Sequence, residues 1–318
     1  MREMNRVLWV NEEDGLARIE AGITGLDLVH ELNRRGYTMG HEPDSMEFST
    51  LGGWIATKAS GMKRNKYGNI EDIVKAVTVV GPNGILSQSV KGDRVFGRES
   101  CSVDLRSLIF GSEGCLGVIT CATVRVWPVA ETKEFDSVIF PDFQSGLCFV
   151  REAAKLGPIL PASIRLLDNE HFRLGLALRP EKHTLMGSAN DVVDLLVRAV
   201  YGFQSHRMVC ATISYEGSSL QVRAERQALA LLTARHGGLR LGASVGKSGY
   251  EMTSMVAYLR DFAMTYHILG ESFETFVPWS KLPAIVDKVK ARIQHEHAAR
   301  LLPGAPFVGC RVTQLYHE

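Results

Sequence analysis

The sequence lacks any apolar run approaching the ~18 residues that a membrane-spanning helix needs. It also lacks net charge of either sign, since 36 Lys and Arg face 35 Asp and Glu, which disfavours nucleic-acid binding through a general basic field. Its six cysteines form no CxxC pair, and the interval between Cys115 and Cys121 is not a spacing of zinc ligands. The residues therefore predict no metal site, and they indicate reduced thiols packed as small apolar groups.

Neither end of the sequence carries a recognisable targeting signal. The first 15 residues contain no apolar segment of a signal peptide, and residues 315–318 are not a peroxisomal Ser-Lys-Leu ending. A length of 318 residues exceeds the usual size of one compact core, so two domains are expected.

Residues 1–133 predict an α+β domain with several strands and few helices. Thr24 fits the N-cap of a helix that ends before Gly36, and Asn83-Gly84 predicts a hairpin turn. Strands are expected at residues 6–10, 16–21, 73–80, 85–89 and 118–126.

Residues 134–318 predict a second domain of different rhythm. Two successive β-α-β units indicate a ferredoxin-like sheet with helices on one face, and residues 174–207 between them are expected to form a loop-and-helix excursion. Strands are expected at residues 137–140, 162–167, 208–215, 239–241, 273–276 and 307–316. Helices are expected at residues 143–156, 218–235, 254–269 and 279–300.

Two glycine-rich runs carry the chemistry, the first at residues 43–63 and the second at residues 111–119. Glycines let the backbone approach a ligand closely, and serines and threonines add hydrogen-bond donors without bulk. These are features that suit a dinucleotide pyrophosphate and a flat ring, yet neither run has the GxGxxG spacing of a Rossmann fold. Either run alone is equally consistent with a tight turn that binds nothing. Their combination favours a ligand.

The two runs resemble FAD-binding enzymes of the vanillyl-alcohol-oxidase-like superfamily, through Pro43, Gly52-Gly53, Ala59-Ser60-Gly61 and the second run. Longer strings single out the alkyldihydroxyacetonephosphate synthase family. These strings are GHEPDSMEFST (40–50), ASGMKRNKYGNIED (59–72), PASIRL (161–166), LGESFET (269–275) and CRVTQ (310–314).

The resemblance implies part of a PCMH-type FAD-binding domain followed by a ferredoxin-like α+β cap domain that takes the substrate. By position, it implies that FAD contacts Asp44, Ser45, Met46, Glu47, Phe48, Ser49, Thr50, Thr57, Lys58, Ala59, Ser60, Glu113, Gly114, Cys115, Leu116, Gly117, Val118 and Ile119. It further implies a catalytic role for Arg165 and a substrate-binding role for Arg260. A guanidinium suits a phosphate or a carboxylate. From the residues alone, Arg260 is more readily a surface ion-pair residue, whereas Arg165 in an apolar strand needs a partner or a ligand.

The activity implied is an alkyl transfer of ether-lipid synthesis. The fatty acyl group of acyl-dihydroxyacetone phosphate is exchanged for a long-chain fatty alcohol through flavin N5. The resemblance also implies a homodimer, peripheral membrane contact and a peroxisomal or glycosomal location. The alternatives are a flavin oxidase or dehydrogenase for a 2-hydroxy acid or an alcohol, and a flavin-binding protein without turnover.

Two parts of the family pattern are absent from the sequence. One is a glycine-rich pyrophosphate loop expected upstream of residue 1, and the other is a tyrosine and a histidine cluster expected downstream of residue 318. We therefore expect a fragment or truncated form of an active enzyme, with weakened FAD affinity and doubtful turnover by this chain alone.

Overall fold

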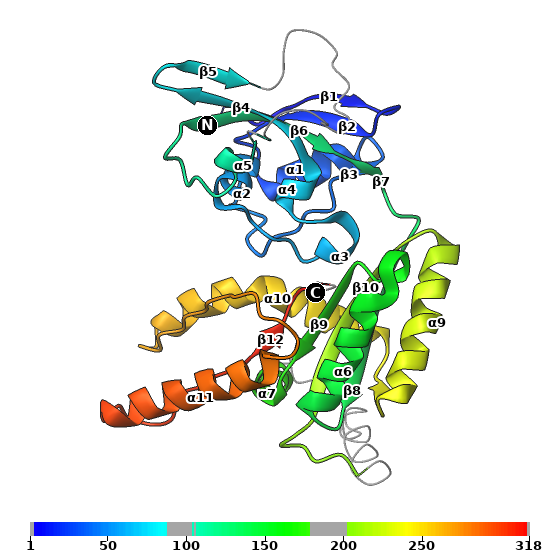
Figure 1. The fold of residues 1–318 in the computed structure, drawn as a ribbon, viewed down its shortest axis with the longest axis vertical. Coiled ribbons are helices and arrows are strands. Elements are labelled where there is room, and N and C mark those ends of the chain that lie inside the picture. Colours follow the sequence, from blue (N-terminus) through cyan, green and yellow to red (C-terminus); the bar gives the residue numbers. More distant parts are fainter. Residues whose placement is uncertain (1–2, 88–103, 105, 179–201, 317–318) are drawn as a thin grey trace. The chain divides into compact units, whose positions relative to one another are not determined.

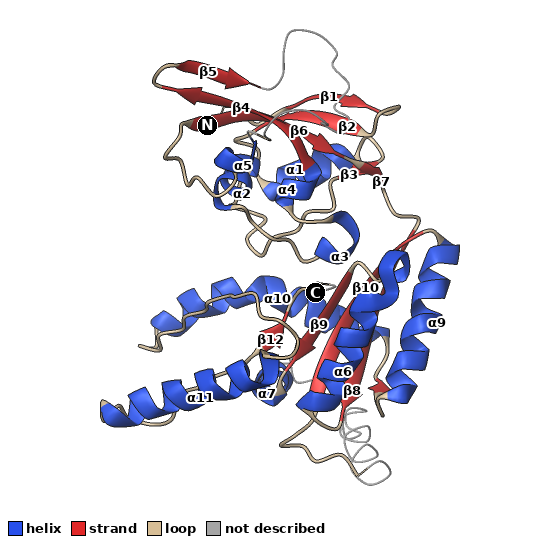
Figure 2. Ribbon diagram, in the orientation of Figure 1, coloured by secondary structure: helices blue, strands red, loops and turns tan. Residues whose placement is uncertain are grey.

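The structure is a computed structural model that describes residues 3–87, 104, 106–178 and 202–316. The chain divides into two compact units, Met1–Glu131 and Thr132–Glu318, with the division two residues before the predicted boundary. Each unit has a hydrophobic core of its own. Both units mix helices with a sheet, so the predicted α+β class is confirmed (Figures 1 and 2).

A five-stranded antiparallel sheet in the order β1-β2-β6-β4-β5 organises the first unit (Figure 1). Its strands are β1 (Val7–Asn11), β2 (Leu16–Glu20), β4 (Val74–Gly81), β5 (Gly84–Ser87) and β6 (Val118–Arg125). The strands β3 (Tyr37–Thr38) and β7 (Trp127–Pro128) form a separate short pair. The helices α1 (Gly25–Asn33), α2 (Leu51–Thr57) and α4 (Ile70–Ile73) bury side chains against this sheet, and α3 (Arg64–Tyr67) contributes Tyr67 to the same core.

A helix cap and a hairpin turn lie where the sequence predicts them. Thr24 accepts a hydrogen bond from the amide of Asp27 and so caps α1, and Gly36 follows the helix with a φ of 81°. The Asn83-Gly84 turn joins β4 to β5 as an antiparallel hairpin. These elements depend on neighbouring residues, which is why the sequence suffices to place them.

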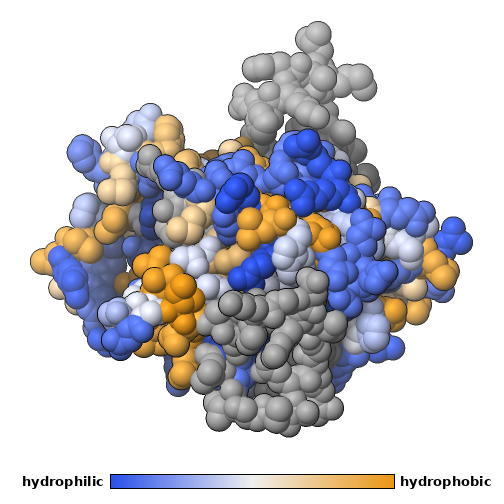
Figure 3. Space-filling view, turned by 90° about the horizontal axis from the view of Figure 1, so that it is seen from above, coloured by the Kyte–Doolittle hydropathy of each residue, from blue (hydrophilic) through white to orange (hydrophobic). Residues whose placement is uncertain are grey.

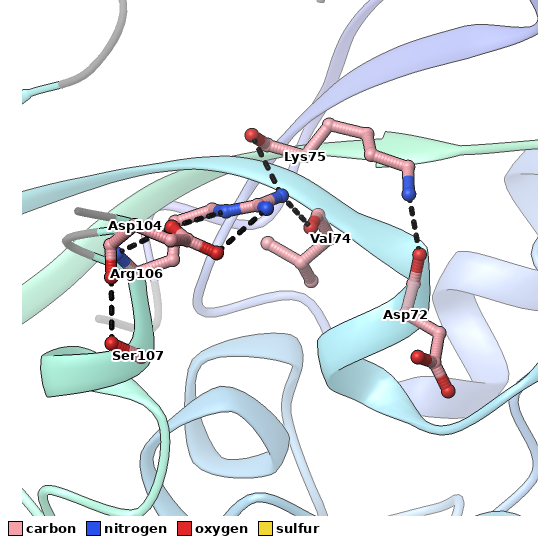
Figure 4. A network of polar contacts seen from close by, with 6 residues as sticks. All are labelled: Asp72, Val74, Lys75, Asp104, Arg106 and Ser107. Atoms are coloured by element: carbon pink, nitrogen blue, oxygen red, sulfur yellow. Dashed lines mark hydrogen bonds and ion pairs between the residues drawn. The ribbon is translucent and has the colours of Figure 1, made fainter. Parts of the chain in front are cut away.

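Arg106 connects the segment before the second run to the sheet (Figure 4). This residue opens helix α5 (Arg106–Ile109), and its guanidinium forms an ion pair of 2.8 Å with Asp104. The same group donates to the carbonyls of Val74 (2.8 Å) and Lys75 (3.2 Å) at the start of β4. The backbone that leads into the second run is thereby fixed to a central strand.

The second unit is built on a sheet in the order β11-β8-β10-β9-β12, in which every pairing is antiparallel. Its strands are β8 (Thr132–Phe140), β9 (Ser163–Leu167), β10 (Val209–Gly217), β11 (Leu239–Arg240) and β12 (Arg311–Val312). The helices α6 (Phe143–Ala153) and α9 (Ser219–Arg235) complete two β-α-β units, and a 3₁₀ turn (Ala154–Ile159) follows α6. The predicted ferredoxin-like sheet is confirmed.

The two faces of this sheet differ in chemistry. Ile164 and Leu166 of β9 point into the apolar core with Phe149 of α6 and Leu229 of α9. The other face carries alternate residues of the same strands, and helix α10 (Ala243–Met264) packs on it. Helices therefore lie on both faces, where the sequence predicted one.

Three expectations for the second unit are wrong. Helix α10 begins at Ala243, eleven residues before the predicted start, because its interior glycines lower the helix propensity of that segment. Residues 273–276 form no strand, and the expected strand at 307–316 is reduced to Arg311–Val312 at the edge of the sheet. A β-rich composition is not enough where no neighbouring strand offers hydrogen bonds.

The remaining helices are α7 (Asn169–Ala177) and α11 (Leu282–Ala299). Most of the excursion predicted at 174–207 lies outside the described residues. Apolar side chains such as Ile85 of β5 and Phe262 of α10 also reach the surface, and a space-filling view shows such patches among hydrophilic ones (Figure 3). Within the described part of the chain, no helix is both long and apolar enough to cross a membrane.

Candidate flavin site and substrate face

The two glycine-rich runs meet at the C-terminal end of helix α2. The amide of Glu113 donates to the carbonyl of Ala56 at 2.9 Å, and the amide of Gly111 donates to the carbonyl of Ile55 at 3.3 Å. The last carbonyls of a helix have no partner within the helix, so the second run supplies donors that α2 itself lacks. Two segments about 50 residues apart in the sequence thus form one surface.

Helix α2 is held by side chains of the first run. Thr50 is the N-cap, and its hydroxyl accepts from the amide of Gly53 at 3.2 Å. The indole nitrogen of Trp54 donates to the hydroxyl of Ser49 at 2.8 Å, and that hydroxyl donates to the carbonyl of Ser45 at 2.6 Å. The hydroxyl of Thr57 donates back to the carbonyl of Gly53. The small polar residues of this run therefore shape the backbone.

Left-handed backbone conformations gather where the runs meet. Lys58 ends α2 with a φ of 53°, and Glu113 in the second run has a φ of 47°. Both are non-glycine residues, for which this region is uncommon. Gly117 has a φ of 140°, and a Cβ there would lie 2.6 Å from the carbonyl oxygen of Val80. Such backbone conformations concentrate at ligand clamps. The lack of a Cβ at Gly117 lets the second run lie directly against β4.

Most of the predicted cofactor-binding residues are exposed. Phe48 is 74% exposed, and Leu116 and Val118 of the second run also expose apolar side chains. The other exposed members are polar or small: Asp44, Glu47, Thr57, Lys58, Glu113, Gly114 and Cys115. Exposed apolar side chains next to polar ones suit a ligand with a flat apolar ring and a charged tail.

Several predicted contacts have side chains turned elsewhere. Ile119 is buried in the core of the first unit, and Met46 and Ala59 pack against that core. Ser60 donates to the side-chain oxygen of Asn69 at 3.1 Å. Ile119, Met46 and Ala59 can therefore face a cofactor mainly through their backbone.

His41 is a candidate that the motif analysis did not single out. The side chain is 2% exposed, lies edge-on to Trp54 with ring centroids 5.1 Å apart, and has no hydrogen-bond partner on either ring nitrogen among the described residues. Burial lowers its pKa to about 4, so the ring is neutral at pH 7. A buried polar group without a partner calls for a ligand or a bound water. No sequence signal could reveal this, because the burial comes from the fold.

An ion pair stands next to His41. Nζ of Lys63 lies 2.5 Å from a carboxylate oxygen of Glu42, and Lys63 is buried. The amide of Met62 also donates to the carbonyl of Glu42 at 2.8 Å. The two ends of the first run are thereby joined, which holds His41 against the residues that follow α2. Donors, a strained glycine turn and an unpartnered buried imidazole together fit a dinucleotide such as FAD.

The two predicted arginines belong to the second unit. Arg165 of β9 is 5% exposed and lies on the sheet face that α10 covers, in register with Thr212 of β10. Arg260 of α10 has a side chain 54% exposed, with carboxylates of Asp261 at 4.0 Å and Glu271 at 3.9 Å. Arg165 is buried, and Arg260 forms the surface ion pairs that its helical position allows. Among the described residues, no group of three or more metal-ligating side chains comes together.

Comparison with known proteins decides the family. The model of the FAD binding domain matches residues 1–88, and that of the C-terminal domain of FAD-linked oxidases matches residues 130–318. The chain belongs to the FAD-linked oxidases. FAD is therefore the cofactor, as the two runs predict.

Within this family the chain is a homologue of alkyldihydroxyacetonephosphate synthases. It is 41% identical to that protein of Caenorhabditis elegans over 99% of this chain and 52% of the relative, and 32% identical to that of Trypanosoma brucei brucei over 87% and 44%. A solved structure of an alkyldihydroxyacetonephosphate synthase superposes with a TM-score of 0.85 at 29% identity, covering 100% of this chain and 57% of the other. The family resemblance of the strings is thus confirmed. The chain spans about half the length of the relatives it matches.

Proposed function

We propose that this chain is part of an FAD-dependent alkyl transferase of ether-lipid synthesis. It would act on acyl-dihydroxyacetone phosphate and a long-chain fatty alcohol, releasing the fatty acid and forming an ether bond. The observation that carries this is similarity to alkyldihydroxyacetonephosphate synthases along both units, joined to a first unit whose two runs form one accessible surface. A flavin surface without the second unit would be compatible with many reactions.

In this proposal the first unit binds the cofactor and the second unit binds the anionic groups of the substrate. Bound FAD supplies the covalent chemistry of the exchange through its N5 atom. The first and second runs bind and orient the cofactor, with His41 as an additional neutral hydrogen-bonding group. In the second unit, Arg165 and Arg260 provide guanidinium groups for the two anions that the reaction requires, a phosphate on the substrate and a departing carboxylate.

A homodimer, peripheral membrane contact and a peroxisomal or glycosomal location belong to the same proposal. Membrane contact is supported by the substrates, because acylated dihydroxyacetone phosphate and a long-chain alcohol both partition into bilayers. The nearly balanced charge of the chain argues against nucleic acid as a partner. Size-exclusion chromatography with light scattering and sedimentation with neutral vesicles would test the dimer and the membrane contact.

The decisive experiment combines flavin titration with an exchange assay. The purified chain is titrated with FAD by fluorescence and then given palmitoyl-dihydroxyacetone phosphate and radiolabelled hexadecanol. Transfer of label into alkyl-dihydroxyacetone phosphate, with fatty acid released in equal amount and no oxygen consumed, supports the proposal. Oxygen consumption with lactate or glycolate would instead favour an oxidase, and flavin binding without turnover of either kind would indicate a binding protein.

A further inference from the structure

Two serines on the α10-covered face of the second sheet have hydroxyls that no described residue hydrogen-bonds. Ser163 of β9 is 2% exposed and Ser214 of β10 is 0% exposed, and neither hydroxyl has a partner among the described residues. The two residues are in direct register across the antiparallel strands. Cross-strand partners on one face have their Cβ atoms about 5 Å apart. Two buried hydroxyls thus stand side by side with their hydrogen-bonding capacity unused.

Arg165 and Thr212 form the next pair along the same two strands. They are also in register with each other, and each lies two residues from a serine, on the same face of the sheet. Both are buried. The four side chains form a two-by-two block, which we call the polar block. A fixed positive charge therefore lies beside two hydroxyl donors in a place closed to bulk water.

Two other polar residues on this face have partners within the protein. The hydroxyl of Ser137 on β8, in register with Thr212, donates to the carbonyl of Gly242 at 3.1 Å. Glu216 of β10 has Nζ of Lys133 at 3.5 Å from its carboxylate. Buried polar groups in folded proteins are nearly always paired, so the two serine hydroxyls, for which the described part of the chain offers no partner, call for a ligand or a bound water.

We propose that Ser163 and Ser214 form an oxyanion subsite next to Arg165, in which both hydroxyls donate to an oxygen of a phosphate or a carboxylate. A hydroxyl hydrogen bond to a charged oxygen is stronger than one to a neutral group, and a low local dielectric strengthens it further. The identity of the anion rests on the proposed function, in which the substrate carries a phosphate and the leaving group is a carboxylate. The subsite itself rests on the geometry of the polar block.

The test measures anion binding to the full chain by isothermal titration calorimetry, with inorganic phosphate and decanoate as separate probes. Because the residues of the polar block are buried, an anion can reach them slowly. Each titration is therefore run long enough for binding to reach equilibrium. Ser163→Ala and Ser214→Ala should each weaken binding of one probe about tenfold, the effect of losing one hydrogen bond to a charged group. The probe that responds identifies the source of the oxyanion.

Thermal unfolding of the ligand-free variants supplies a second readout. Removing an unpartnered buried hydroxyl, which leaves the methyl side chain of alanine, should leave the melting temperature unchanged or raise it. The matched control is Ser137→Ala, which removes a satisfied hydroxyl from the same face and should lower the melting temperature without changing anion affinity. These measurements need neither FAD nor turnover. Anion binding can therefore be detected when the exchange assay shows no activity, and the exchange assay can show activity when no anion binding is detected, so the two proposals are tested separately.

Two results would overturn the subsite. One is that neither phosphate nor decanoate binds the wild-type chain saturably. The other is that the double variant S163A/S214A binds both probes as the wild type does while melting at a lower temperature, which would mean that a bound water satisfies the serines.

Discussion

Asp168 ties together three parts of the second unit, and its replacement by alanine should be among the most damaging single changes there. The residue follows β9 and caps α7, where its carboxylate accepts from the amide of His171 at 3.0 Å. Its other oxygen accepts from Nζ of Lys290 on α11 at 2.5 Å and from the amide of Cys310 at 2.8 Å. One buried carboxylate therefore holds helix α11 and the segment before β12 to the sheet.

The magnitude follows from these contacts. Loss of an N-cap alone costs about 1 kcal/mol. Removing one partner of a buried ion pair costs about 3–5 kcal/mol, because the remaining groups stay buried without compensation. Lys290 keeps part of its contact with water, with a side chain 27% exposed, so Asp168→Ala should lower the free energy of unfolding by about 3–4 kcal/mol.

A matched control separates capping from ion pairing. Asp142 caps α6 by accepting from the amide of Ser145 at 2.8 Å, and its carboxylate also lies 3.4 Å from the exposed Arg207. Asp142→Ala should therefore cost about 1 kcal/mol. Urea unfolding followed by far-UV circular dichroism measures both variants. Equal losses for the two variants would refute the central role of the Asp168 carboxylate.

The same carboxylate predicts a pH dependence. Burial alone would raise the pKa of Asp168, but hydrogen bonds from His171 and the contact with Lys290 outweigh it and lower the pKa below its usual value. A depressed carboxyl pKa contributes stability above the unfolded value of about 3.9 and loses it as the pH falls through the folded pKa. Wild type should therefore lose more stability than Asp168→Asn on acidification below about pH 4.

Three further predictions concern the candidate site. Burial lowers the pKa of His41 to about 4, against about 6.5 in the unfolded chain. The first unit should therefore lose about 2 kcal/mol of stability between pH 7.5 and pH 5, measured by urea unfolding. The variant His41→Gln should abolish this loss. Gly117→Ala should destabilise that unit by about 2–4 kcal/mol, because the new Cβ would clash with the backbone of Val80. Gly114→Ala has nothing within 4 Å of the new Cβ and should cost about 1–2 kcal/mol. Similar losses for the two variants would contradict the close packing of Gly117. Arg260→Ala should raise the KM for the phosphate-bearing substrate about tenfold with an unchanged melting temperature, since its ion pairs are exposed; a large loss of stability would make Arg260 structural.

Helix α10 shows why parts of the fold escape prediction from sequence. Its segment contains Gly246 and Gly249, and each interior glycine costs about 1 kcal/mol of helix propensity relative to alanine. In the structure, a Cβ at Gly246 would lie 2.2 Å from the carbonyl oxygen of Asp136, and one at Gly249 would lie 2.6 Å from the side chain of Thr212. The glycines allow the helix to lie directly on the sheet. Tertiary packing thus reverses a local preference, and no window of sequence can report it.

Some features of the candidate flavin site were also predictable from local sequence, whereas others depend on the fold. The two runs together, with their glycines and small hydroxyl residues, favoured a dinucleotide ligand, and the family model for an FAD-binding domain agrees over the first run. The role of His41 and the unpartnered serines of the polar block was not visible, since both depend on what other segments fail to offer them. A hydrogen-bond deficit is a property of the folded environment.

The junction of the two runs gives the candidate site its physical logic. The carbonyls of Ile55 and Ala56 at the end of α2 accept amides from Gly111 and Glu113, while Lys58 turns the chain away in a left-handed conformation. These bonds satisfy the end of a helix and, by the same act, place the second run beside the first. Substitutions that distort the second run should therefore also loosen α2 and the residues after it. Termination of this helix and placement of the second run therefore depend on the same two hydrogen bonds. Under the proposed function, a change in either run should weaken FAD binding through the other.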